Sequence, residues 1–417
     1  MLFYPIASLI FIAAISRHIT KSWLSPGCFF SSCWAFFIIV PVVFAPEYTI
    51  DQIALWFIAI FSMSIASGSI IAYSKDVKSM VNNTFQIDYN FLFYFMSGFI
   101  LISLFGLVQL FNYATTIYVS GKYLNDWMMI PNMIAVDRYS GILNYPSIIK
   151  YSLYFIYPAN LLGGLLFLHN NKSKTIKFLS LLPLILAILL GIMEGARTSF
   201  LLALIMFFSA WLSTFIFKRR KKLGLKKLYF RIIIGTGFTI VLFTSFFVLV
   251  QWLRQGMDTI IVDSLIDRIR AYFFGYLAAF SQWLNMMPES SIFNTGFITF
   301  AGPFNLIGIM ERPLGFYNPT YISNDVSTNV FTAFRGIVTD FSIPGAIIIA
   351  FVIGFIFQII FQKGKTILST IPISMFYAFT LYSPLISIFH YNSILFSWLI
   401  LLIILMISRY EPLDNFR

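Results

Sequence analysis

Two short segments bring an arginine and a carboxylic acid together at the end of an apolar stretch. Glu194 ends one such stretch and Arg197 opens the next, with only a Gly-Ala pair between them. Arg335 and Asp340 lie close together where a later apolar stretch begins. Arginine binds phosphate through two parallel hydrogen bonds, and ionisable side chains in membrane segments usually mark a substrate path. These residues therefore predict a site for an anionic, phosphate-bearing ligand.

Three side chains are candidates for the general acid or base of such a site. Asp340 is the first, because a helix would place it about a turn and a half from Arg335 and away from bulk water. Glu194 and His390 are the other two. Each has a structural alternative. Asp340 could cap a helix, Glu194 could pair with Arg197 to close a hairpin, and a lone histidine is more often structural than catalytic.

Arg254 is a further candidate for binding phosphate, since it follows an apolar stretch on the same side as Arg197 and Arg335. Arg138, in Asp-Arg-Tyr-Ser-Gly, has a similar position. A long basic side chain that merely reaches from the membrane to water looks the same in sequence. Convergence of Arg197, Arg254 and Arg335 in space would favour a binding role.

No metal or cofactor is expected. Cys28 and Cys33 are the only cysteines, and both lie in one apolar stretch. The chain has no His-x-x-x-His or Asp-x-Asp spacing, and its external acids occur singly. It also lacks a Walker A loop, a G-x-S-x-G elbow and a dinucleotide fingerprint, so nucleotide-driven chemistry is not expected.

The elements that must position these residues are membrane helices. The chain has 417 residues, of which 59% are hydrophobic and 11% charged, a composition typical of membrane proteins. The net charge of +12 comes from short basic runs between apolar stretches, which does not indicate nucleic-acid binding. We therefore expect an all-α, polytopic protein with a single membrane domain, 1–417.

Eleven apolar stretches approach the roughly 20 residues that a membrane-spanning helix needs. They are residues 2–16, 27–45, 52–74, 90–113, 147–168, 176–193, 198–217, 230–250, 336–361, 367–389 and 393–408. The first is short, but it lacks a basic n-region and a cleavage pattern, so we expect a retained helix rather than a signal peptide.

The basic residues orient these helices, because short cytoplasmic loops carry the excess of Lys and Arg. An external N-terminus and a cytoplasmic C-terminus place thirteen Lys and six Arg inside, and two Lys and seven Arg outside. Arginine is thus enriched where topology does not require it. Either it binds phosphate there, or it pairs with external acids, Glu47 and Asp340 among them.

Two external loops are long enough to hold a site, residues 114–146 and the much larger 251–335. Residues 262–283 of the second loop have helical spacing, with acids and arginines on polar positions. We expect this loop to form a lid or re-entrant cap. No internal repeat of the kind found in many transporters is present.

These features resemble the O-antigen polymerase (Wzy) family, the oligosaccharide repeat unit polymerases. The resemblance rests on the length, the eleven stretches, the large external loop, and two short segments. The segments are Ala196-Arg197-Thr198-Ser199 and residues 328–345.

The resemblance implies a C-type glycosyltransferase fold (GT-C) in the bacterial inner membrane. Such an enzyme polymerises undecaprenyl-diphosphate-linked repeat units on the periplasmic side, without a cofactor and together with membrane lipid and a chain-length regulator. Arg197, Arg254 and Arg335 would hold the lipid diphosphate and stabilise its developing charge. Asp340, Glu194 or His390 would remove the proton of the acceptor hydroxyl.

Two alternatives share parts of this pattern. An O-antigen ligase has the same general architecture and substrate, but the ligases compared rely on a histidine in the large external loop, and residues 251–335 contain none. A lipid-linked oligosaccharide flippase or exporter would also carry intramembrane charge. Flippases usually have more spans and no large external loop, so the sequence favours the polymerase.

Overall fold

The structure, a computed structural model, describes most of the chain. The described residues are 2–74, 89–118, 129–143, 145–167, 174–218, 244–254, 262–287, 296–310, 317–364 and 366–408. They are almost entirely helical, and the described strands form one two-stranded hairpin. The predicted all-α, membrane-embedded multi-pass protein is confirmed at this level.

Seven stretches of helix in the described residues are long and apolar enough to cross a membrane. They are α1 (Phe3–Thr20), α2 (Pro26–Phe44), α3 (Gln52–Ile71), α4 (Tyr89–Tyr118), Thr175–Met193, Arg197–Ile216 and α15 (Ala333–Lys363). Two shorter apolar stretches, Ile367–Tyr382 and α17 (Asn392–Ile407), match the last two predicted spans. Of the predicted span 230–250, only residues 244–250 lie within the described part.

Prolines explain where the apolar stretches are interrupted. A proline lacks the N–H that would bond to the carbonyl four residues earlier, and its ring clashes with that carbonyl. Pro158 thus coincides with the break that divides the predicted span 147–168 into α6 (Ser147–Tyr154) and α7 (Ile156–Phe167). In the same way, Pro183 separates α8 (Lys174–Leu179) from α9 (Leu182–Met193).

The described helices form two compact units. Unit 1 comprises Met1–Phe85, Arg270–Leu395 and Pro412–Arg417, and unit 2 comprises Gln86–Ile269 and Phe396–Glu411. The single membrane domain stays a prediction.

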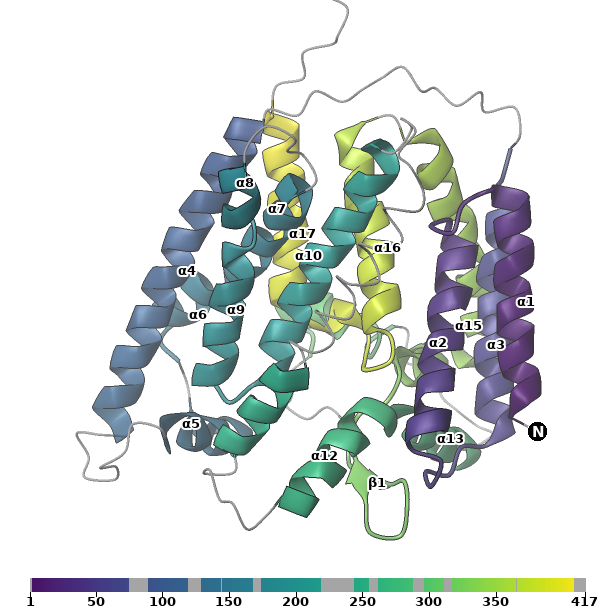
Figure 1. The fold of residues 1–417 in the computed structure, drawn as a ribbon, viewed down its shortest axis with the longest axis horizontal. Coiled ribbons are helices and arrows are strands. Elements are labelled where there is room, and N and C mark those ends of the chain that lie inside the picture. Colours follow the sequence, from purple (N-terminus) through teal and green to yellow (C-terminus); the bar gives the residue numbers. More distant parts are fainter. Residues whose placement is uncertain are drawn as a thin grey trace, which may run out of the picture. The chain divides into compact units, whose positions relative to one another are not determined.

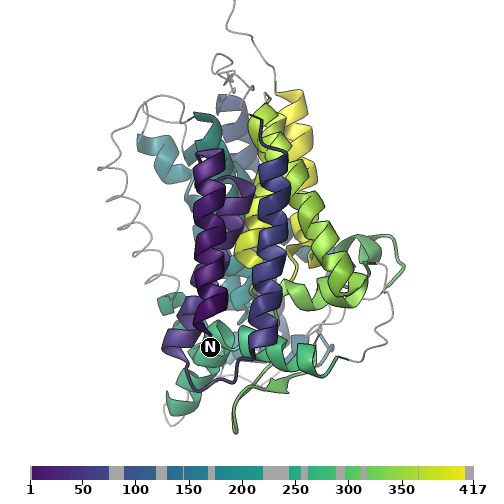
Figure 2. The ribbon, with the colours of Figure 1, turned by 90° about the vertical axis from the view of Figure 1, so that its right-hand side faces the viewer.

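In unit 1, α1, α2, α3 and α15 run side by side (Figures 1 and 2). The closest packing joins α3 to α15, where Gly354 lies against the carbonyl of Ile65 and leaves no room for a Cβ. Ser69 Oγ donates to Gln358 Oε1 across the same interface at 2.8 Å. Small residues at close helix crossings, with polar side chains bonded between the helices, are typical of membrane proteins.

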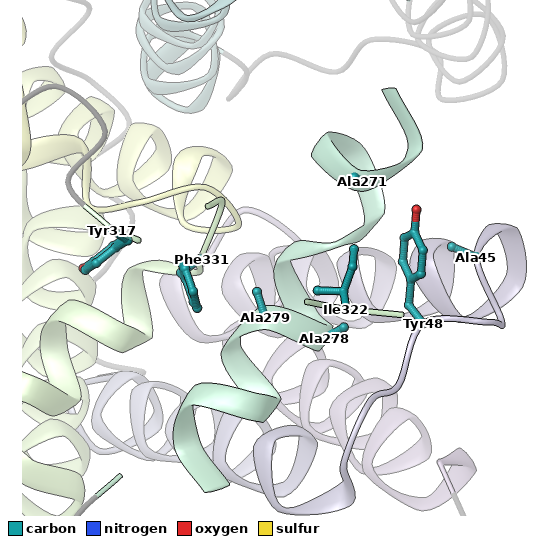
Figure 3. Packing of buried hydrophobic residues seen from close by; sticks show 8 residues of the cluster. All are labelled: Ala45, Tyr48, Ala271, Ala278, Ala279, Tyr317, Ile322 and Phe331. Carbon is teal, nitrogen blue, oxygen red and sulfur yellow. The ribbon is translucent and has the colours of Figure 1, made fainter. Parts of the chain in front are cut away.

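The described part of the predicted external loop from residue 270 onward belongs to unit 1 and is here called the cap. It contains the end of α12 (Val262–Phe274), α13 (Tyr276–Asn285), α14 (Ala301–Leu306), β1 (Thr320–Tyr321) and β2 (Ser327–Thr328). The two strands pair antiparallel, with Thr320 opposite Thr328. Eight buried residues form the cluster beneath them (Figure 3): Ala45, Tyr48, Ala271, Ala278, Ala279, Tyr317, Ile322 and Phe331.

Three polar contacts fasten α13 to the membrane helices of unit 1, one of them from the Asp51 N–H to Ser281 Oγ at 2.6 Å. The Tyr276 hydroxyl donates to the carbonyl of Phe37, which Pro41 leaves without its usual helical partner. Asn285 donates to Asp51 at 2.8 Å, and Asp51 also caps the first turn of α3. These hydrogen bonds hold the pKa of the Asp51 carboxyl below its ordinary value. The cap therefore has a fixed position on unit 1.

Unit 2 contains α4, α5 (Ile130–Tyr139), α6 to α9 and α10 (Arg197–Lys218), together with helical residues 244–254. Helices α7 and α10 pack through Gly164, whose Cα lies against the carbonyl of Phe207. Helix α5 lies in the predicted external loop 114–146 and covers the end of α4 through Ile130 and Ile134. This places the polar end of α5 beside the hairpin between α9 and α10.

Candidate functional site

Arg335 occupies the first turn of α15, in unit 1. Its neighbour Phe334 is fully buried in an aromatic core, with ring centroids 4.6 Å from Trp34 and 4.9 Å from Phe61. Because successive side chains of a helix point about 100° apart, Arg335 projects away from the bulk of this core. The buried Phe334 side chain thus fixes the direction in which the Arg335 side chain points.

Three aromatic rings of the cap surround the Arg335 guanidinium. Its central carbon lies 4.0 Å from the ring centroids of Tyr317 and Phe331, and 5.5 Å from that of Trp283. A cation over an aromatic face is stabilised without being neutralised. Within the described part of the chain, no carboxylate forms an ion pair with Arg335. The site therefore presents a half-buried positive charge.

Tyr317 does not supply a countercharge. Burial raises the pKa of its hydroxyl, and the positive charge of Arg335 opposes this shift only in part. The phenol is thus neutral at physiological pH, and the guanidinium keeps its full charge. An anionic ligand would be the natural complement of this arrangement.

Asp340 is buried, and both of its oxygens accept main-chain hydrogen bonds. The N–H of Ile298 donates to Oδ1 at 3.1 Å, and the N–H of Thr299 donates to Oδ2 at 2.5 Å. Two residues later, Ser342 has a positive φ of 61° and interrupts α15 just ahead of Pro344. Asp340 as the base stays a prediction, and its partners are N–H groups of the turn that precedes α14 rather than of a helix.

His390 ends the short 3-10 helix η4 (Ile388–His390) of unit 1 and is only 3% exposed. Next to it, the hydroxyls of Tyr391 and Tyr382 are hydrogen-bonded at 2.8 Å. A buried imidazole in a packed turn fits a structural role. Its catalytic role also stays a prediction.

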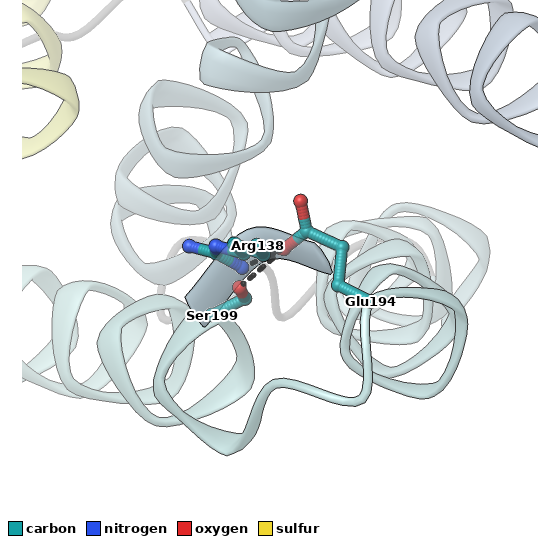
Figure 4. Close-up of polar contacts among 3 residues, drawn as sticks. All are labelled: Arg138, Glu194 and Ser199. Carbon is teal, nitrogen blue, oxygen red and sulfur yellow. Dashed lines mark hydrogen bonds and ion pairs between the residues drawn. The ribbon is translucent and has the colours of Figure 1, made fainter. Parts of the chain in front are cut away.

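In unit 2, Glu194 forms an ion pair with Arg138 rather than with Arg197 (Figure 4). Arg138 Nη1 donates to Glu194 Oε2 at 3.0 Å, and the Ser199 hydroxyl donates to the same oxygen at 3.3 Å. The pairing of Glu194 with Arg197 to close the hairpin is therefore wrong. Sequence predicted that Arg138 is external, but it did not indicate its partner.

Gly195 allows Arg138 to reach Glu194. Gly195 makes the hairpin turn with a φ of +57°, a conformation that favours glycine. A Cβ on this residue would lie 2.8 Å from the carbonyl oxygen of Pro131 and 3.2 Å from Ala135. The missing side chain thus allows α5 to lie directly on the turn, and α5 carries Arg138 to Glu194.

Arg197 starts α10 and lies over an aromatic ring, as Arg335 does. Its guanidinium carbon is 4.3 Å from the ring centroid of Phe247, in the helical segment 244–254. Arg254 is the last described residue of that segment and is partly buried. Both arginines thus belong to unit 2, and Arg197 contacts the helical segment that Arg254 ends.

Tyr145 adds a neutral donor to the polar end of unit 2. Burial raises the pKa of its hydroxyl, and the charge of Glu194 raises it further. The group therefore keeps its proton at physiological pH. Tyr145 could not be recognised from sequence as part of this site, because its proximity to Glu194 depends on how the chain turns after α5.

The candidate residues fall into two groups. Arg335, Asp340 and His390 belong to unit 1, whereas Glu194, Arg197, Arg254 and the additional Arg138 belong to unit 2. Convergence of the two groups on one substrate stays a prediction. In the described residues, no cluster of three or more His, Cys, Asp or Glu side chains could hold a metal ion.

The pair of Arg138 and Glu194 can be tested by comparing single and double variants. The side chain of Glu194 is only 9% exposed, so Arg138→Met leaves a buried carboxylate with little besides Ser199 to stabilise it. We expect this variant to lose about 1 to 2 kcal/mol of stability. The double variant Arg138→Met/Glu194→Gln should recover most of that loss in thermal unfolding of the detergent-solubilised protein. Equal losses in both variants would contradict a stabilising pair.

Comparison with known proteins found no relative of this chain. No family model matches the chain, no curated protein matches it, and no solved structure matches it.

Proposed function

We propose that this chain is a glycosyltransferase that polymerises oligosaccharide repeat units carried on undecaprenyl diphosphate. In this proposal it has a GT-C-like fold and lies in the bacterial inner membrane, with a periplasmic N-terminus and a cytoplasmic C-terminus. Donor and acceptor are both lipid-linked, and a chain-length regulator is a further partner. The reaction takes place on the periplasmic side.

The observation that carries the proposal is the environment of Arg335. A guanidinium that three aromatic rings support, with no carboxylate paired to it in the described residues, is suited to a ligand bearing its own negative charge. It lies in the first turn of a helix that is long and apolar enough to cross a membrane, and in this proposal that end of the helix meets the diphosphate head group. A purely structural arginine would normally be paired or reach open water.

The proposed reaction is a substitution at the anomeric carbon of the donor. A hydroxyl oxygen of the acceptor repeat unit forms the new glycosidic bond as the bond to the diphosphate oxygen breaks. The electron pair leaves with the lipid diphosphate, and the hydroxyl proton passes to a base or to water. Because negative charge grows on the leaving oxygen, a fixed cation beside it lowers the barrier.

Both carboxylates that are candidates for the base already accept hydrogen bonds. Glu194 accepts hydrogen bonds from Arg138 and Ser199, and Asp340 accepts two from the main chain. Stabilisation of the leaving diphosphate by arginine therefore contributes more to this proposal than proton removal does.

Purified protein in detergent tests the proposal against a transporter. With a lipid-linked repeat unit as the sole substrate, we expect glycans of two or more units on the lipid, although no sealed membrane is present. A flippase would leave the substrate unextended in detergent and move it across proteoliposomes. A ligase would extend nothing until lipid A core was added. Either of these two outcomes would overturn the proposed function.

A further inference from the structure

Residues 296–306, here called the wedge, comprise a turn and α14, and three side chains of unit 1 anchor them. Asp340 accepts the N–H groups of residues 298 and 299. Ser387 Oγ donates to the carbonyl of Thr299 at 2.8 Å, and Asn392 Nδ2 donates to Asn305 Oδ1 at 2.8 Å. The wedge is thus held from α15 on one side and from residues 387–392 on the other.

The wedge also lies against the residue that follows Arg335. A Cβ on Gly336 would lie 3.2 Å from Ile298 Cγ2, 3.5 Å from the Tyr317 hydroxyl and 3.7 Å from Thr299 Oγ1. Gly336 therefore lies directly between the wedge and Tyr317. Since the Tyr317 ring in turn supports the Arg335 guanidinium, a shift of the wedge would be transmitted to both residues.

The break in α15 makes these contacts necessary. Ser342 has non-helical dihedral angles, and Pro344 cannot donate to the carbonyl of Asp340. The first part of α15, which carries Arg335, is therefore not held in line with the rest by continuous helical hydrogen bonds. Its orientation depends on tertiary contacts, and the hydrogen bonds of Asp340 to the wedge are among them.

We infer that Asp340 is a positioning residue, which sets the Arg335 guanidinium through the wedge, and not the general base. The inference rests on the proposed function for its catalytic consequence only. A base needs a lone pair directed at the substrate. Asp340 is fully buried and directs both oxygens at main-chain N–H groups, so a proton placed on it would cost a hydrogen bond that holds the wedge.

Cysteine labelling tests the anchoring without reference to activity. Thr299 is 5% exposed, and Thr299→Cys keeps the main-chain N–H that Asp340 accepts. We expect this cysteine to react slowly with a water-soluble maleimide. Adding Asp340→Ala or Ser387→Ala should accelerate labelling about tenfold or more, because each leaves a wedge group without its partner. The parent chain, with Cys28 and Cys33, gives the background rate.

A matched control separates the wedge from general loss of stability. Ser374 is another buried serine of unit 1 whose hydroxyl donates to a carbonyl, that of Ile371, at 2.8 Å. Ser374→Ala also removes a hydroxyl-to-carbonyl hydrogen bond, here to a residue three positions earlier and away from the wedge. It should leave both the labelling rate and the donor KM unchanged. Labelling accelerated equally by Ser374→Ala would overturn the anchoring role.

Steady-state kinetics of chain extension then distinguish positioning from base catalysis. If Asp340 positions Arg335, Ser387→Ala and Asp340→Asn should both raise the donor KM, and kcat should fall by less than about tenfold. If Asp340 is the base, Asp340→Asn should lower kcat by about a hundredfold or more while Ser387→Ala is silent, and the inference is then overturned. Fast labelling with an unchanged KM would also overturn it. Absence of chain extension by the parent protein would instead refute the proposed function, and the labelling would still decide whether Asp340 anchors the wedge.

Discussion

Replacing Arg335 with alanine is expected to leave single repeat units on the lipid carrier and to abolish the ladder of longer glycans. The substitution removes the positive charge that would stabilise the departing diphosphate, and loss of one such group typically costs about a hundredfold to a thousandfold in rate. The three surrounding rings would remain, so the fold should be retained. Electrophoresis of the glycans made by cells carrying the variant provides the measurement.

Arg335→Lys is the sharper form of this experiment. Lysine keeps the charge, but it has no planar group to stack between rings and cannot form two parallel hydrogen bonds to a phosphate. We expect Arg335→Lys to remain at least about tenfold below the parent in kcat/KM. Full activity would show that only a point charge is needed.

Arg270 offers a matched control for Arg335. It is also an arginine of unit 1 that is predicted to be external, but it pairs with Glu47 at 2.6 Å and donates to the carbonyl of Phe44 at 3.0 Å. Arg270→Ala should therefore leave the glycan ladder intact. A normal ladder with Arg335→Ala, or the same loss with both variants, would contradict a specific role for Arg335.

Pairing with acids explains two of the arginines that were predicted to be external. Arg138 and Arg270 pair with Glu194 and Glu47, as the structural explanation requires. Arg197 and Arg335 lie over aromatic rings, and their binding of phosphate stays a prediction. Sequence could not separate these groups, because each acid is distant from its arginine along the chain.

The membrane helices could be predicted because hydrophobicity and length are local properties of the chain. Their interruptions were not predicted, since 147–168, 176–193 and 336–361 were expected to be unbroken, although Pro158, Pro183 and Pro344 each follow a break by a few residues. The role of Asp340 could not be read in this way. Its partners, residues 298 and 299, come from another segment, and only the folded cap brings their N–H groups to the carboxylate.

Gly354→Leu is expected to prevent unit 1 from folding. Gly354 lies against the backbone of Ile65, and Gly68 lies equally close to the carbonyl of Phe351. Because the obstruction is backbone rather than a movable side chain, α3 and α15 would have to separate. The hydrogen bond from Ser69 to Gln358 would then be broken in the low-dielectric interior of the membrane.

We expect the cost to be about 3 kcal/mol or more, which is at or above the usual range for overpacking. The measurement is the fraction of detergent-solubilised protein that elutes as a monodisperse peak, together with its unfolding temperature. Gly98→Leu is the matched control, because Gly98 is also a helical glycine in a membrane span and nothing lies within 4 Å of its Cβ position. This variant should behave as the parent does. The break at Ser342 separates Gly354 from the part of α15 that carries Arg335. A folded Gly354→Leu protein would therefore mean that α15 can move on α3 without unfolding, and that their packing is not needed for unit 1 to fold.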